Sequence, residues 1–338
     1  MNATPEIKFI YLTQKEVVAA GLDMKLTLET IEKVFRLHAE GKVILPYKTV
    51  LDLGEKERGR INAMPAYVGG DIDRCGIKWI AGFPKNPWEH NLPRATGLII
   101  INDSWTGIPL AVMDCTLISA MRTGAVTGVG AKYLARKDSE VVAMIGGGVQ
   151  ARTQLEALVN VLHNLKEVRV FDIRKEVAER YAKDMSEKTR LKVIAVDSPK
   201  DAVVGADIIV TVTVADEPIV KDAWVKEGSF FSHVGSYQEE EYEVVLHSDK
   251  IVVDEWEHVL HRKTPVLAKM YLDGTLSKDR IYANLGEIII GKKKGRENDK
   301  ERIFFSPIGL GSEDVAVASM IYLKAKERDL GTVLSLFG

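Results

Sequence analysis

Residues 140–162 read EVVAMIGGGVQARTQLEALVNVL, in which an apolar run, three glycines and a helical pattern follow one another. The apolar run predicts a strand, and the apolar spacing from Val149 onward predicts a helix. Glycines between a strand and a helix are typical of a dinucleotide-binding loop, because the helix N-terminus presents free N–H groups to phosphates. Gly146 would allow the tight turn, Gly148 would let the backbone approach a pyrophosphate, and Ala151 would allow close helix–strand packing. The alternative is a glycine turn in an α/β protein that binds no nucleotide.

An acidic residue follows this loop at the distance that dinucleotide-binding domains show. Asp172 ends the next strand pattern, EVRVFD. A carboxylate there binds the hydroxyls of the adenosine ribose and repels a 2′-phosphate, so the sequence predicts NAD in preference to NADP. Arg174 leaves NADP open. Val149 and Gln150, the first residues of the predicted helix, are also expected at the cofactor.

Strand and helix patterns alternate from the glycine loop onward, which predicts βαβ units around a parallel sheet. The strand patterns cover residues 140–146, 167–172, 192–196, 207–214, 229–235 and 250–255. The chain ends carry a different mixture of short strands, turns and helices, including a helix at 312–331. The predicted fold class is therefore α/β. A Rossmann-type doubly wound NAD domain, residues 123–305, is inserted in a mixed α+β domain made from residues 1–122 and 306–338.

The composition of the chain excludes several classes of protein. The 338 residues are 46% hydrophobic and carry a net charge of −2, which favours a globular protein without nucleic-acid or anionic-membrane partners. A bilayer-spanning run and a secretory signal are both missing, so we expect a cytoplasmic protein. Cys75 and Cys115 fit neither a disulfide framework nor a zinc site. His258 and His261 fall on a predicted strand-to-loop segment, without the spacing of a helical metal site, so no metal is expected.

Seven motifs along the chain are specific in combination: NAMPAYVGG, GIKWIAGFP, ATGLIIINDSWTGIPLAVMD, ISAMRTGAVTGVGAKYLAR, IGGGVQAR, ADIIVTVT and SPIGLGSEDVAVA. With these motifs the chain resembles the ornithine cyclodeaminase/μ-crystallin family over nearly its whole length. RATGLIIIND, SAMRTGAV and DKIVVDEWE add a similarity in layout to the branch that holds N-(2-amino-2-carboxyethyl)-L-glutamate dehydrogenase, which makes a siderophore precursor. The resemblance implies a homodimer, a nicotinamide cofactor, and hydride transfer at the α-carbon of an amino acid or imine.

The resemblance also implies a basic clamp for the substrate α-carboxylate. Lys78 and Arg122 match the family's substrate lysine and carboxylate-binding arginine. The third clamp position is usually arginine and is Lys48 here, as in the siderophore branch. Each basic residue alone would be interpreted as a surface charge, but three at matching positions favour a clamp. Further residues are expected at the substrate (Met64, Tyr237 and Gly309) and at the cofactor (Thr123, Thr211, Thr213 and Gly235).

Two residues are candidates for proton transfer. Lys78 is the first, because a desolvated lysine beside other cations has a lowered pKa. Asp314 is the second, since it matches a family aspartate at the start of the last predicted helix. The alternative for Asp314 is a helix N-cap.

One departure from the family bears on the reaction. Ornithine cyclodeaminases place an aspartate after the fifth sheet strand to bind the side-chain amine, and Tyr237 occupies that position here. A phenol is a weak base at neutral pH. Glu239, Glu240 and Glu241 offer substitute carboxylates, although a solvated acidic turn is the favoured interpretation of this run.

The sequence therefore predicts an NAD-dependent amino-acid dehydrogenase or imine reductase. The alternative is an ornithine cyclodeaminase that converts ornithine to proline and ammonia and recycles NAD. A third hypothesis, a non-catalytic nucleotide-binding protein like the crystallins, is disfavoured by the retained basic clamp.

Overall fold

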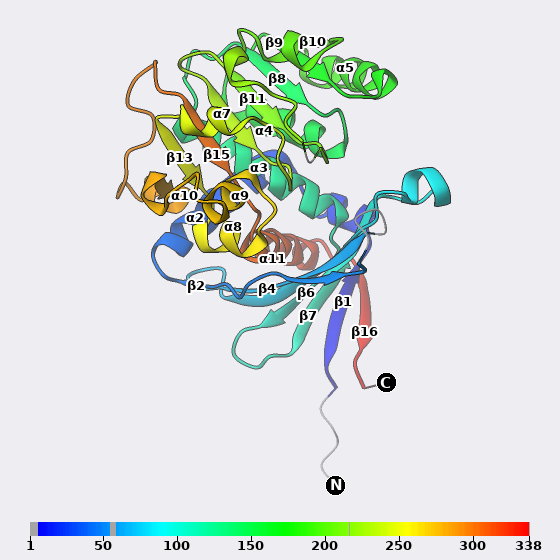
Figure 1. Ribbon diagram of the computed structural model, residues 1–338. Coiled ribbons are helices and arrows are strands. Elements are labelled where there is room, and N and C mark those ends of the chain that lie inside the picture. The colour runs from blue at the N-terminus through cyan, green and yellow to red at the C-terminus, as the bar shows by residue number, and fades with distance from the viewer. Residues whose placement is uncertain (1–5, 55–58, 216, 338) are drawn as a thin grey trace. The chain divides into compact units, whose positions relative to one another are not determined.

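The computed structural model describes residues 6–54, 59–215 and 217–337, which fall into two compact units (Figure 1). The first unit comprises the segments 1–122 and 310–338, and the second comprises the segment 123–309. The boundary at Arg122 lies within helix α3 (Thr116–Leu134). The second unit ends at Gly309 rather than at the predicted residue 305, because the turn that follows its strand β15 (Ile303–Ser306) still belongs to it.

The first unit contains a mixed sheet built from both ends of the chain. Across this sheet the strands are β16 (Thr332–Ser335), β1 (Lys8–Leu12), β7 (Pro109–Asp114), β6 (Ala95–Asp103), β5 (Arg74–Gly82), β4 (Arg60–Val68) and β2 (Val43–Ile44), with β3 (Thr49–Asp52) also paired to β4. β1 runs parallel to β7, and the other pairs are antiparallel. β1 and β16 lie side by side in Figure 1.

Among its described residues, the first unit wholly contains the α-helices α1 (Gln14–Ala19), α2 (Met24–Ala39) and α11 (Gly311–Glu327). A single π-helical turn covers Asn86–His90. α11 packs on β4, β5, β6 and α2. It confirms the helix predicted near the C-terminus, but the chain then turns through Gly331, at φ +100°, into β16, which the sequence analysis did not predict.

The second unit contains an eight-stranded sheet in which every pair is parallel. Its order is β10 (Lys192–Ala195), β9 (Glu167–Phe171), β8 (Val141–Ile145), β11 (Ile208–Thr211), β12 (Phe230–His233), β15, β13 (Lys250–Val253) and β14 (Ile281–Asn284). The chain moves outward from β8 through β9 to β10, and then starts again on the other side with β11. The point where the strand order reverses therefore lies between β8 and β11, which confirms the predicted doubly wound fold.

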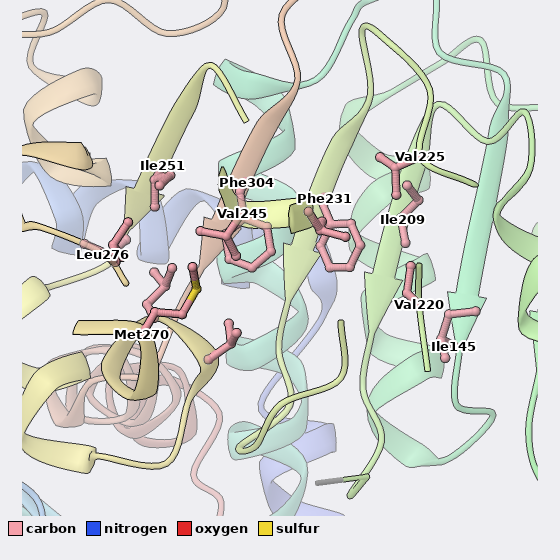
Figure 2. Close-up of a cluster of buried hydrophobic side chains, with 14 of the residues drawn as sticks. Ile145, Ile209, Val220, Val225, Phe231, Val245, Ile251, Met270, Leu276 and Phe304 are labelled. Atoms are coloured by element: carbon pink, nitrogen blue, oxygen red, sulfur yellow. The ribbon is translucent and has the colours of Figure 1, made fainter. Parts of the chain in front are cut away.

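Helices accompany the strands of this sheet, namely α4 (Val149–Val161), α5 (Lys175–Thr189), α6 (Pro199–Val203), α7 (Tyr242–Leu246), α8 (Trp256–Arg262), α9 (Val266–Leu272) and α10 (Leu285–Ile289). Short 3-10 turns cover Asp222–Trp224 and Lys278–Arg280. One face of the sheet carries an apolar cluster that includes Ile209, Phe231 and Phe304 (Figure 2). Among the residues that the structure describes, no helix has the length and apolar character needed to cross a bilayer.

Two local predictions are corrected by the structure. The strand predicted for 207–214 ends at Thr211, because the N–H of Thr213 donates to the Glu239 carboxylate instead of to a neighbouring strand. His258 and His261 lie on helix α8, not on a strand-to-loop segment. Trp256 and Val259 are buried at helical spacing on that segment, which favours the helix.

Candidate active site

Lys78 lies in the middle of β5, on the face of the first sheet that α11 covers. Side chains alternate along a strand, so Trp79 points to the opposite face, and its exposed fraction is 46% against 1% for Lys78. Met64 on β4 is directly opposite Lys78 in the strand register and is also buried. The predicted substrate residues Met64 and Lys78 are therefore neighbours.

The first turn of α11 brings two carboxylates to this face. Gly311 opens the helix, and a Cβ atom there would lie 2.8 Å from the Met64 carbonyl oxygen, so the helix start is pressed against β4. Leu310 occupies the N-cap position. The N-cap alternative for Asp314 is therefore wrong. Asp314 and its neighbour Glu313 are fully buried within the first turn.

Asp314 joins the two principal basic residues of the predicted clamp. Its carboxylate lies 2.7 Å from Lys78 Nζ and accepts a 3.1 Å hydrogen bond from Arg122 Nε. Arg122 Nη1 also donates to Glu313 at 2.6 Å, and Lys78 Nζ donates to Ser119 Oγ at 3.1 Å. Two cations and two carboxylates thus form one buried network, in which Asp314 fixes the separation of Lys78 and Arg122.

This network changes the acid–base chemistry of its members. Burial, and then the nearby Arg122 guanidinium, lower the pKa of Lys78, and the Asp314 carboxylate opposes them only in part. A lysine whose pKa is lowered can both accept and release a proton at moderate pH. Burial raises the pKa of the neighbouring Cys115 thiol to about 12, so Cys115 remains protonated and is no nucleophile.

The three glycines of the quoted stretch differ in their surroundings. Gly146 has φ +104°, a conformation that L side chains rarely adopt. A Cβ atom on Gly147 would touch Val177 at 3.3 Å. Gly148 has an ordinary φ of −74°, and a Cβ atom there would meet nothing within 4 Å. Neither the backbone nor the packing requires glycine at 148, so this open space fits a bound pyrophosphate.

The surroundings of this loop also fit a dinucleotide. Gly148 is the N-cap of α4, so the first helical residues present N–H groups beside the loop, and Val149 there is 71% exposed. Asp172 Oδ2 accepts from Gly147 N at 2.9 Å, which holds the acidic residue against the loop. Asp172 Oδ1 accepts from Arg174 N at 3.0 Å. The predicted adenosine carboxylate and the predicted phosphate loop are therefore in direct contact.

The remaining predicted cofactor residues lie on two parts of the same unit. Thr211 ends β11, and the loop that follows carries Thr213, while Gly235 follows β12. Both strands end at the carboxyl edge of the sheet, beside the point where the strand order reverses. Thr123, on α3, accepts from Gln154 through its carbonyl oxygen.

Three predicted substrate residues lie on loops, and their roles stay predictions. Lys48 is half-buried between β2 and β3. Tyr237 is half-buried in the turn after β12. Gly309 has φ +76° and donates its N–H to Asp254 Oδ2 at 2.7 Å.

The structure adds residues that the sequence analysis missed. Glu313 joins the clamp network, and its position beside Asp314 in the motif SEDV was an available signal. Glu239 and Glu240 are fully buried, so the interpretation of their segment as a solvated acidic turn is wrong. Across residues 6–54, 59–215 and 217–337, no group of three metal-binding side chains is arranged to hold an ion.

The chain is similar to known proteins in both sequence and structure. The sequence pattern of the ornithine cyclodeaminase/mu-crystallin family matches residues 10–329. N-((2S)-2-amino-2-carboxyethyl)-L-glutamate dehydrogenase of Staphylococcus aureus is 33% identical over 98% of this chain and 99% of its own. The Thermococcus litoralis Δ(1)-pyrroline-2-carboxylate reductase, solved with NADH and L-proline, is 38% identical, with a TM-score of 0.90 over 96% of this chain and 99% of its own. An archaeal alanine dehydrogenase dimer with bound NAD is 36% identical, with a TM-score of 0.90 over 98% of this chain and 100% of its own.

The open space at Gly148 yields a prediction about Gly148→Ala. The added methyl group meets no protein atom, so the free energy of unfolding should change by no more than about 1 kcal/mol, the cost of alanine at an N-cap. Binding of NAD⁺ should weaken at least about tenfold, because the methyl group occupies the space for the pyrophosphate. Calorimetric titration of the apoprotein with NAD⁺, together with thermal unfolding, checks both results. Unchanged affinity would contradict a phosphate site at this loop.

Proposed function

Because the chain belongs to the ornithine cyclodeaminase/mu-crystallin family, we propose that it is an NAD-dependent oxidoreductase acting on the carbon–nitrogen bond of an amino acid. The observation that carries this proposal is the buried network of Lys78, Asp314 and Arg122. It combines a guanidinium suited to an α-carboxylate with an amine of lowered pKa suited to proton transfer at an α-amino group.

The cofactor assignment is supported by the glycine loop and by the relatives. Two relatives were solved with NADH or NAD bound. In this chain the backbone at Gly146–Gly148 would hold the pyrophosphate, Asp172 would bind the adenosine ribose, and Thr211, Thr213 and Gly235 would lie at the nicotinamide. When bound, the nicotinamide supplies the hydride acceptor or donor at the α-carbon.

The residues of the network then have distinct roles. Arg122, assisted by Lys48, binds the α-carboxylate, and Asp314 holds Arg122 and Lys78 at a fixed separation. Neutral Lys78 takes a proton from the substrate ammonium group. The nitrogen lone pair is then free to form the carbon–nitrogen double bond as hydride leaves the α-carbon. In the reverse direction Lys78 donates the proton as the imine is reduced.

The cyclodeaminase alternative requires a carboxylate for the side-chain amine of ornithine. Tyr237 occupies the position of the family aspartate. Glu239 accepts hydrogen bonds from Thr213, and Glu240 lies 3.0 Å from His233, so both candidate substitutes already have buried partners. These contacts favour a dehydrogenase or imine reductase.

The first sheet also supports a homodimer. Its face opposite α11 presents a row of partly exposed apolar side chains, namely Leu51, Ile61, Ile77, Trp79, Leu98 and Ile100. Trp79 and Leu98 are directly paired and are 46% and 42% exposed. A contiguous apolar patch of this kind is typical of a subunit interface. The alanine dehydrogenase relative was solved as a dimer.

The proposal is tested by incubating the purified protein with NAD⁺ and a panel of ornithine, alanine, proline, glutamate and N-(2-amino-2-carboxyethyl)-glutamate. NADH and ammonia are followed together. Net NADH formation with one amino acid is the expected result, and the amino acid that gives the fastest reaction identifies the substrate. Conversion of ornithine to proline and ammonia without net NADH would instead establish the cyclodeaminase.

Replacement of Lys78 by arginine should keep a cation beside Asp314 but remove the ability to release a proton, because a guanidinium stays protonated. We expect kcat to fall by about 10²- to 10⁴-fold, the usual contribution of a general acid–base. In the native enzyme, kcat/KM should rise with pH through an ionisation below the ordinary lysine pKa, because the pKa of Lys78 is lowered. Lys42→Met, at an exposed lysine of the same unit, is the control. If the same rising limb persists in Lys78→Arg, the ionisation belongs to the substrate amine.

Trp79→Glu should convert the dimer to a monomer, because it places a charge in the centre of the apolar face. Size-exclusion chromatography with light scattering measures the mass in solution. Leu272→Glu, at an exposed position of the second unit, is the matched control and should leave the mass unchanged. A dimer that survives Trp79→Glu would show that another surface forms the interface.

A further inference from the structure

The turn that follows β12 is anchored by a buried carboxylate, Glu239. Its Oε1 accepts from both the backbone N–H and the hydroxyl of Thr213, at 2.6 Å each. Its carbonyl oxygen accepts from Ile219 N at 2.9 Å and Val220 N at 3.0 Å. Glu239 therefore ties the loop after β11 to the turn after β12 at four hydrogen bonds.

Gly235 is adapted to this carboxylate. No left-handed φ requires glycine at this position. A Cβ atom on Gly235 would instead lie 1.8 Å from Glu239 Oε2, so a side chain at 235 would force the Glu239 carboxylate to move. Glycine at 235 therefore leaves the space that the Glu239 carboxylate occupies.

A histidine and a second carboxylate are buried beside Glu239. His233 Nδ1 lies 3.0 Å from the Glu240 carboxylate and 3.7 Å from Glu239, and all three side chains are fully buried. Burial alone would lower the pKa of His233, but the two carboxylates outweigh it and raise that pKa. The raised pKa favours the cationic form of the imidazole, which offsets part of the negative charge of the two buried carboxylates.

Thr213 connects this cluster to the phosphate loop. The position of a Cβ atom on Gly146 lies 3.2 Å from Thr213 Cγ2. Glu239 thus holds Thr213 beside the glycine loop, at the carboxyl edge of the strands that flank the reversal of strand order. A dinucleotide lies across this edge in a doubly wound sheet.

We propose that Glu239 is a positioning residue for the cofactor, which fixes Thr213 at the nicotinamide end of the dinucleotide site. This inference rests on the proposed function, because it assigns part of the NAD site. It goes further by assigning Glu239, which follows Tyr237 at the position of the cyclodeaminase aspartate, to cofactor binding rather than to the substrate amine.

The experiment measures the dissociation constant of NAD⁺ from the apoprotein for variants of Glu239 and of its neighbour Gly235. Glu239→Ala should raise Kd about tenfold, the effect of losing one or two charge-assisted hydrogen bonds. Gly235→Ala should do the same in the native background, because the methyl group displaces the carboxylate.

Conservative variants separate positioning from folding. Glu239→Gln retains an oxygen that accepts from both groups of Thr213, so Kd should stay within about threefold of the native value. Glu239→Met fills the same volume without an acceptor and should weaken NAD⁺ binding as Glu239→Ala does, even if alanine prevents folding. Amide hydrogen exchange at Thr213 should accelerate in Glu239→Met and not in Glu239→Gln. Glu243→Ala, an exposed carboxylate on α7, is the control.

The outcomes distinguish this inference from the function on which it rests. If the native protein binds no NAD⁺, the proposed function fails. If the native protein binds NAD⁺ and Glu239→Met binds it equally well, the function stands and the positioning role is wrong. Amide hydrogen exchange at Thr213 that is unchanged in Glu239→Met would likewise overturn the inference.

Discussion

The buried carboxylate of Asp314 is the interaction on which the first unit depends. Its two cationic partners lie at positions 78 and 122, far from it in the chain. Removing one member of a buried ion network costs about 3–5 kcal/mol, because the remaining charges lose their compensation. The network therefore constrains β5, α3 and α11 together. The same constraint gives Lys78 its altered proton affinity, so stability and chemistry come from one set of contacts.

In the second unit, carboxylates take the place of backbone hydrogen-bond acceptors at the edge of the sheet. Asp172 accepts from Gly147, Glu239 accepts from Thr213, and Asp254 accepts from Gly309. Each carboxylate satisfies an N–H group of a turn that follows a parallel strand, where no ladder partner exists. The loops at the carboxyl edge are thereby held in fixed shapes before any ligand arrives, which lowers the cost of ordering them on binding.

The sequence predicted the features that depend on local patterns. Short stretches of sequence are enough to predict the alternation of strands and helices, the glycine loop and the acidic residue at 172. The prediction of a doubly wound sheet follows from these features. β16 was not predicted because it forms by pairing with β1, which lies far from it in the sequence. Glu239 and Glu240 were misjudged for the same reason. Three adjacent glutamates resemble a solvated turn unless the partners Thr213 and His233 are known to lie beside them.

The pairing of β1 with β16 has a consequence for how the chain tolerates alteration. β16 covers one side of β1, whose other side pairs with β7. An uncovered strand edge is a template for association with other chains. Removing β16 would make β1 the edge strand of this sheet and would leave the β1 N–H and C=O groups that face β16 open to pairing with another chain.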